Sequence, residues 1–64
     1  MNLRAERIRR GLTLPEFAKA AGVTYRVARQ AEAGQPVRED NAKLLADFLD
    51  VDPIVFVEPE RTTA

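Results

Sequence analysis

The sequence contains no cysteine, no histidine and no serine. Without cysteine no disulfide forms, and without thiolate and imidazole groups the commonest transition-metal ligands are missing, so we expect neither a metal nor another cofactor. The same three absences exclude the usual nucleophilic triads, and we expect no enzyme. A chain free of cysteine also fits a reducing cytoplasm, which is the location we expect.

Long apolar segments are missing as well. The longest uninterrupted apolar run, residues 54–57, is far shorter than the roughly 20 residues of a membrane span, and the N-terminus has no apolar signal segment. We therefore expect no membrane association. With 64 residues the chain has room for one small domain, in which only about 60% of the unfolded chain's surface becomes buried.

The formal net charge of zero conceals a division of charge along the chain. Up to Gln30 there are seven basic and two acidic residues, a balance of +5, whereas beyond Gln30 three basic residues stand against eight acidic ones, a balance of −5. This asymmetry is typical of a protein with one half facing a polyanion. Attraction between the two halves within the fold explains the same pattern equally well.

Local signals in the sequence predict four helices. They cover residues 3–10, 14–21, 25–33 and 39–49. In the first, Ala5, Ile8 and Leu12 recur at i, i+3 and i+7 and form a narrow apolar stripe. Before the second, Thr13 followed three residues later by Glu16 is typical of a capping box, in which each side chain accepts a hydrogen bond from the other's backbone N–H. The sequence therefore indicates an all-α fold.

A three-residue turn that begins at Gly22 and ends at Thr24 separates the second and third predicted helices. Glycine adopts the left-handed conformation that ends helices, and threonine is a favoured N-cap. A helix, a short turn containing glycine and a second helix form the helix-turn-helix unit, in which the second helix enters the major groove of DNA. We expect this geometry for residues 14–33.

The third predicted helix has two different faces. One carries Ala28, Ala31 and Glu32, and the opposite one carries polar, planar and basic side chains. Arginine matches the two major-groove acceptors of guanine, the amide of glutamine matches adenine, and tyrosine contacts a thymine methyl group or a phosphate. We therefore expect base contacts with double-stranded DNA from Tyr25, Arg26, Arg29 and Gln30. The alternative for the arginines is an ordinary solvated helix face.

Other polar or cationic side chains are candidates for contacts with the DNA backbone, because phosphate contacts position a protein on the duplex. These candidates are Thr24, Arg10, Lys19 and Arg38. For Arg10, an ordinary solubilising role is an equal alternative.

Three segments resemble the phage Cro and repressor type of helix-turn-helix proteins: LRAERIRRGLT (3–13), LPEFAKAAGVTYRVARQAEAG (14–34) and KLLADFLDV (43–51). The resemblance implies a bundle of four or five helices, transcriptional control as a repressor, and a homodimer on a pseudo-palindromic operator. It also implies an ion pair between Arg7 and Glu32 that ties the first helix to the third. One departure is Leu14, where the family usually has a glutamine that contacts phosphate.

Residues 52–64 are predicted to form a tail that follows a DNA-binding domain of residues 1–51. The β-branched and aromatic residues Ile54, Val55, Phe56 and Val57 favour an extended strand, although Asp52-Pro53 is typical of a helix start. An exposed edge strand would pair with the same strand of a second copy and make a dimer. The alternative is that the segment packs back on its own domain as a fifth helix or a strap.

A protein-interaction module is the main alternative function. An antitoxin or an anti-repressor on the same scaffold would use the acidic half and the apolar tail as its working surface, since one fold hosts many functions. Salt distinguishes the two functions, because the affinity of a protein for DNA falls steeply as salt rises.

Overall fold

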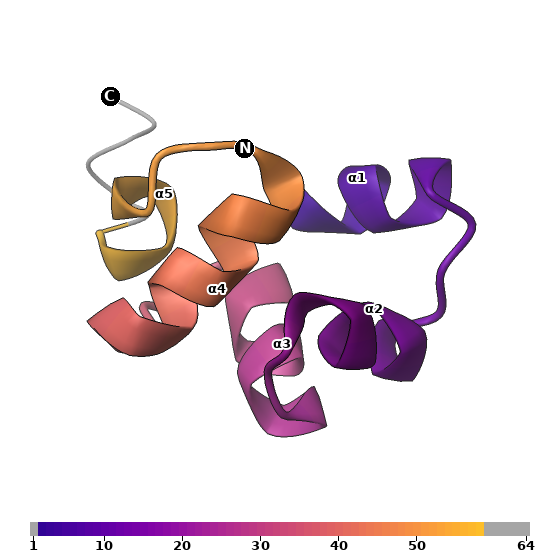
Figure 1. Cartoon of the computed structure of the whole chain (residues 1–64), viewed down its shortest axis with the longest axis horizontal. Helices are drawn as coiled ribbons and strands as arrows, with labels where there is room; N and C mark the ends of the chain where they lie inside the picture. Colours follow the sequence, from indigo (N-terminus) through magenta and orange to yellow (C-terminus); the bar gives the residue numbers. More distant parts are fainter. Residues whose placement is uncertain (1, 59–64) are drawn as a thin grey trace.

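Five helices form the secondary structure of residues 2–58, the part of the chain that the computed structural model describes. They are α1 (Leu3–Arg9), α2 (Leu14–Ala21), α3 (Tyr25–Glu32), α4 (Glu39–Leu49) and α5 (Ile54–Val57). In the bundle, α2 packs against α3 and α4, α1 packs against α3, and α5 packs against α4 (Figure 1). The predicted all-α class is confirmed, and the predicted helix ends agree to within one residue.

Side-chain caps begin the first three helices. Asn2 Oδ1 accepts a hydrogen bond from the Ala5 backbone N–H at 3.0 Å. At the start of α2 the predicted capping box is present, because the Thr13 hydroxyl accepts from the Glu16 N–H at 3.3 Å and the Glu16 carboxylate accepts from the Thr13 N–H at 2.8 Å. These bonds satisfy N–H groups that have no partner within the helix, so the sequence sets these starts locally.

The hydrophobic core lies between α2, α3 and α4. Phe17 on α2 is fully buried, and its ring packs edge-on against Phe48 of α4 with centroids 5.4 Å apart. Ala28 on α3 is also fully buried and belongs to the same core as the two aromatic rings. The buried apolar residues are Leu3, Phe17, Ala18, Ala21, Ala28, Ala31, Val37, Ala42, Leu45, Ala46, Leu49 and Phe56.

Of the expected apolar stripe Ala5, Ile8 and Leu12, only Leu12 packs against this core. Ala5 is exposed and the Ile8 side chain is 59% exposed, whereas Leu3 is buried and Arg7 half-buried. Leu3 and Arg7 are four residues apart and therefore share a helix face. Arg7 pairs with Glu32 on α3, so the face of α1 that carries Leu3 and Arg7 is directed inward, whereas Ile8 is exposed.

The expected strand at residues 54–57 is wrong, because these residues form the short helix α5. Asp52 Oδ1 accepts a hydrogen bond from the Ile54 N–H at 3.0 Å and supports its first turn. Burial decides the conformation: Phe56 is only 4% exposed and belongs to the same core as Leu45. A β-branched composition yields to packing of this kind, because strand propensity depends strongly on context.

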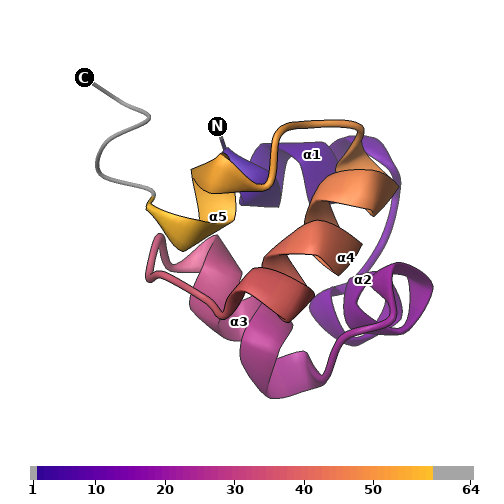
Figure 2. The same cartoon turned by 60° about the vertical axis from the view of Figure 1, so that its left-hand side comes forward.

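In this arrangement the segment packs back on its own domain. Figure 2 shows α5 above the loop that joins α3 and α4, where the Val37 N–H donates to the Phe56 carbonyl at 3.0 Å. The remainder of the predicted tail, residues 59–64, lies outside the described residues. Within residues 2–58, no helix combines the length and the apolar character that crossing a bilayer requires.

Candidate nucleic-acid interface

The turn between α2 and α3 sets the direction of the second helix. Gly22 ends α2 with φ +84°, a left-handed conformation that side chains other than glycine rarely adopt. The Val23 N–H then donates to the Ala18 carbonyl at 3.0 Å, and the Thr24 hydroxyl accepts from the Val27 N–H at 3.2 Å. The second helix therefore starts within two residues of the glycine, as the sequence indicates.

The two faces of α3 meet different surroundings. Ala28 and Ala31 are buried against the core, whereas Tyr25, Arg26 and Arg29 are exposed. The Tyr25 side chain is 50% exposed although it is a large aromatic group. The structure therefore brings Tyr25, Arg26 and Arg29 together as exposed residues of one open surface, on which Gln30 also lies but is half-buried.

A hollow of about 350 Å³ lies at the C-terminal part of this surface. Its lining residues are Arg26, Arg29, Gln30, Ala33 and Gln35. Two guanidinium groups and two amides around one opening present several hydrogen-bond donors to solvent, together with the two amide oxygens as acceptors. Such a surface suits an anionic, hydrogen-bonding ligand such as the edge of a DNA groove.

Gln30 differs from the other predicted base-contacting residues. It is half-buried, and its Nε2 donates a hydrogen bond to the Pro36 carbonyl at 2.9 Å. The amide therefore already has a partner within the protein. Sequence reasoning missed Pro36, because a backbone carbonyl has no signature in the sequence.

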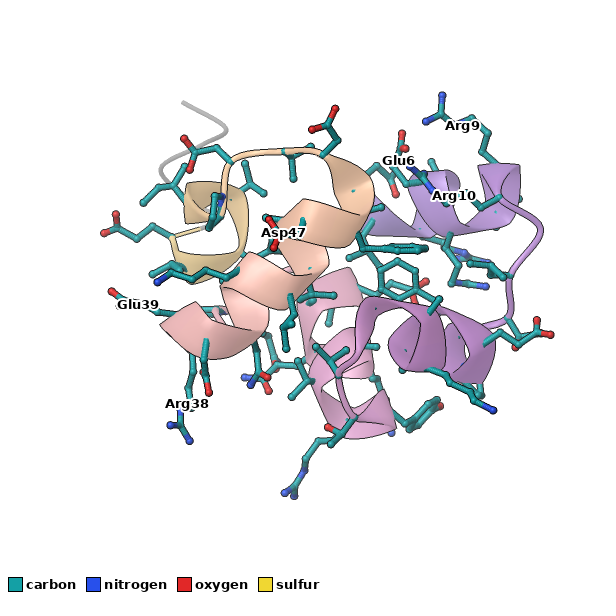
Figure 3. The ribbon with its side chains drawn as sticks, in the orientation of Figure 1. Glu6, Arg9, Arg10, Arg38, Glu39 and Asp47 are labelled. Carbon is teal, nitrogen blue, oxygen red and sulfur yellow. The ribbon has the colours of Figure 1, made fainter. Side chains whose placement is uncertain are left out.

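The candidates for phosphate contacts divide into two groups. Arg38 precedes α4 and projects from the same lower edge of the molecule at which α3 lies (Figure 3). Its side chain is 84% exposed, and Nε lies 3.7 Å from Asp40 Oδ1. Lys19, in the last turn of α2, and Thr24 are also exposed. These three residues remain accessible to a partner.

Arg10 lies elsewhere. In Figure 3 it sits with Glu6 and Arg9 on α1, at the edge opposite Arg38. Arg10 Nη1 donates to Glu6 Oε1 at 2.7 Å, and its guanidinium carbon lies 5.7 Å from the centre of the Phe48 ring. The hydrogen bond from Arg10, with the nearby charge of Arg9, holds the pKa of the Glu6 carboxyl below its usual value. The structure therefore separates Arg10 from the surface of α3.

The pair implied by the resemblance is present as a contact between α1 and the end of α3. Arg7 Nη2 lies 3.1 Å from Glu32 Oε1, and Arg7 Nη1 donates to the Leu12 carbonyl at 2.9 Å. The two side chains are only 16% and 17% exposed. Loss of one partner would leave a largely buried charge without compensation.

Several of the basic residues pair with acidic residues within the fold. Arg7 and Glu32 join the halves, whereas Arg9 and Arg10 pair with Glu6 within α1. Asp47 lies on the outer face of α4, away from the lower edge that carries α3 (Figure 3). Within residues 2–58, the exposed Arg26 and Arg29 of α3 make no ion pair with a carboxylate.

Comparison with known families agrees with this geometry. The helix-turn-helix family model matches residues 3–56, which include α1 to α4 and most of α5. The match confirms the resemblance to Cro-type helix-turn-helix proteins, a family of DNA-binding regulators that are not generally enzymes. No curated protein and no solved structure matches the chain.

Proposed function

The chain belongs to the helix-turn-helix family of DNA-binding regulators, and we propose that it is a sequence-specific, Cro-like phage or prophage repressor. The observation that carries the proposal is the asymmetry of α3. Its small inner residues are packed against the core, while Tyr25, Arg26 and Arg29 are exposed on the outer face. A helix that enters the major groove needs one face packed against its own domain and an opposite, polar face that is free to contact the bases.

In this proposal Arg26 and Arg29 contact guanine through O6 and N7, and Tyr25 contacts a thymine methyl group or a phosphate. Thr24, Lys19 and Arg38 contact the DNA backbone, because all three are exposed near the turn or beside α3. Arg10 is left out of the contact set, since Glu6 and Phe48 hold it on the other side of the molecule.

We also propose that the protein binds its operator as a homodimer. Few phosphate contacts are available to one copy, so a single domain binds weakly. Edge-to-edge strand pairing is not the mechanism, because residues 54–57 are helical. A hollow of about 290 Å³ between α4 and α5 offers another surface, lined by Glu39, Lys43, Asp52, Pro53, Ile54 and Val57.

The chemistry of this hollow fits a second copy of the chain. Its apolar wall includes Ile54, whose side chain is 40% exposed. Lys43 shares the rim with the carboxylates of Glu39 and Asp52, so a two-fold arrangement would set the cation of each copy against an anion of the other. Two recognition helices related in this way would meet half-sites about 34 Å apart on B-DNA.

The first test is the selection of preferred sites from random duplex DNA, with affinity measured at two salt concentrations. We expect a two-fold symmetric motif with half-sites about one helical turn apart, and an affinity that falls steeply between 50 and 200 mM salt. Recovery of no motif would contradict the repressor proposal and direct attention to a protein partner of the acidic half.

The dimer is tested separately with Ile54→Glu, which places a charge in the α4–α5 hollow. We expect sedimentation of the complex with a symmetric site to show one bound copy instead of two, while the preferred half-site sequence is unchanged. Ile8→Glu is the matched control, because Ile8 is also exposed but lies on α1. Equal behaviour of the two variants would contradict the proposed dimer surface.

A further inference from the structure

The loop between α3 and α4 is fastened at three successive residues. The Gln35 N–H donates to the Gln30 carbonyl at 3.1 Å, and the next two residues, Pro36 and Val37, form what we call the strap. On one side, the Pro36 carbonyl accepts the hydrogen bond from Gln30 Nε2 at 2.9 Å. On the other side, the Val37 N–H donates to the Phe56 carbonyl of α5 at 3.0 Å, and the Val37 side chain is buried. The strap therefore joins the recognition helix to α5.

The bond to Pro36 fixes the orientation of the Gln30 amide. A carbonyl oxygen only accepts hydrogen bonds, so the nitrogen and not the oxygen of the amide must face Pro36. Turning the amide towards a base would break this exposed bond, and water would take the place of the amide at the Pro36 carbonyl. Gln30 is also half-buried, unlike Arg26 and Arg29 on the same helix.

Arg38 follows the strap directly, so the position of the strap sets the position of Arg38. Arg38 and Gln30 line one hollow of about 360 Å³, together with Val27, Pro36, Val37 and Asn41. Beyond the 3.7 Å approach to Asp40, which exceeds the length of a hydrogen bond, the Arg38 side chain extends into solvent. A cation of this kind binds a phosphate best when its backbone is already held in place, because less conformational freedom is lost on binding.

We propose that Gln30 is a positioning residue that clamps the strap to α3, so that Arg38 is held where it meets a phosphate of the DNA backbone. This inference depends on the proposed function, since it assigns a phosphate contact to Arg38. It changes the role expected for Gln30 from the sequence: the residue acts through Arg38 and contributes equally to binding of every DNA sequence.

The first experiment uses the free protein and compares Gln30→Ala with Gln35→Ala by NMR. Gln35 is a suitable control because it lines the same basic hollow as Gln30, while no side-chain hydrogen bond is observed for it within residues 2–58. We expect Gln30→Ala to accelerate hydrogen exchange of the Val37 amide and to increase the mobility of residues 35–38. Unchanged exchange and mobility in Gln30→Ala would overturn the clamp.

The second experiment measures DNA affinity for Gln30→Ala, Arg38→Ala and the double variant, on the preferred site and on random duplex. We expect Gln30→Ala to weaken both DNAs by the same factor. The slope of log affinity against log salt should decrease by up to about 0.9, the contribution of one phosphate contact. The factor by which the wild type binds DNA more tightly than the variant then falls by about threefold as salt rises from 50 to 200 mM. The double variant should bind no more weakly than Arg38→Ala.

Two outcomes of the second experiment would overturn the proposal. A loss of preference at one base pair with an unchanged salt slope would assign Gln30 to a base contact. Additive losses in the double variant would show that Gln30 does not act through Arg38. A wild-type chain that binds no DNA would overturn the proposed function and the phosphate contact of Arg38 together, and the NMR comparison would still decide whether Gln30 holds the strap.

Discussion

The helices of the N-terminal half, α1 to α3, and those of the C-terminal half, α4 and α5, are stabilised in different ways. Each of the first three starts at an N-cap residue whose side chain accepts a hydrogen bond from the helix, whereas the N-cap residues of α4 and α5 make no such bond. In α5 a side-chain bond comes instead from Asp52, one residue before the N-cap. Both halves contribute fully buried residues to the core, Phe17 and Ala28 from the first and Ala42 and Leu45 from the second. The starts of α1 to α3 are therefore set by local hydrogen bonds, whereas the positions of α4 and α5 depend more on packing in the shared core.

The largest expected effect tests this dependence on the core. Phe56→Ala should lower the free energy of unfolding by about 3–5 kcal/mol, because it removes a buried aromatic ring and leaves a cavity. Ile54→Ala, on the exposed side of the same helix, should cost much less. Denaturant unfolding of both variants measures the difference, and equal losses would contradict burial as the reason that residues 54–57 are helical.

The next effect concerns the contact between α1 and α3 in the N-terminal half. Glu32→Gln should lower the free energy of unfolding by about 3 kcal/mol, since it leaves the Arg7 guanidinium in a largely buried position without its anion. Glu39→Gln, at an exposed carboxylate of α4, is the control. A melting temperature of Glu32→Gln equal to that of the control would show that the ion pair contributes little.

The exposed surfaces of the two halves should differ in their effect on DNA. Arg29→Ala should cost about 1–3 kcal/mol on the preferred site and relax the preference at one base pair, as expected for a base contact. Asp47→Asn, on the outer face of α4, should leave the sequence preference unchanged. Binding titrations on the preferred site and on its single-base variants provide the measurement. Equal losses for Arg29→Ala on specific and random DNA would refute the base contact.

Side-chain capping should also contribute more to the stability of the N-terminal half than to that of the C-terminal half. Thr13→Ala removes the N-cap of α2 and should cost about 0.5–2 kcal/mol of stability. Arg38→Ala changes the N-cap position of α4, where no side-chain bond exists, and should stay within about 0.5 kcal/mol. Thermal unfolding of the pair checks the comparison. A larger loss for Arg38→Ala would mean that the C-terminal half also depends on local capping.

The smallest effect depends on pH. The hydrogen bond from the Thr13 backbone N–H, followed by that with its side chain, lowers the pKa of the Glu16 carboxyl. The pKa of Glu16 is therefore lower in the folded state than in the unfolded state. The stabilisation by the ionised Glu16 carboxylate is complete above the usual carboxyl pKa of about 4.3, and it is lost as pH falls through the lowered pKa of the folded state.

Glu16→Gln isolates this effect, because glutamine keeps the capping box but does not titrate. We expect unfolding curves of the variant to depend less on pH below about 4.3 than those of the wild type. Identical pH dependence in the two proteins would show that Glu16 makes no such contribution.

The sequence by itself determined those features that depend on neighbouring residues. Asn2, Thr13 and Thr24 cap helices through hydrogen bonds that span three residues, and Gly22 ends α2 because of its own conformational freedom. The spacing along α3 likewise places Tyr25, Arg26 and Arg29 on one face, since helical periodicity is a local property. For these reasons the helix-turn-helix unit and most of its outer surface were predictable.

Only the tertiary structure decided the features that depend on residues distant in the sequence. The core buries Phe56 in a helix over residues 54–57 despite their β-branched composition, and α1 directs Arg7 towards Glu32 and leaves Ile8 exposed. The Arg10 guanidinium lies over the Phe48 ring, and the Gln30 amide donates a hydrogen bond to the Pro36 carbonyl. Local preferences leave several environments for these side chains nearly equal in free energy. Packing and long-range hydrogen bonds then decide between those environments, so no local pattern in the sequence predicts which one is adopted.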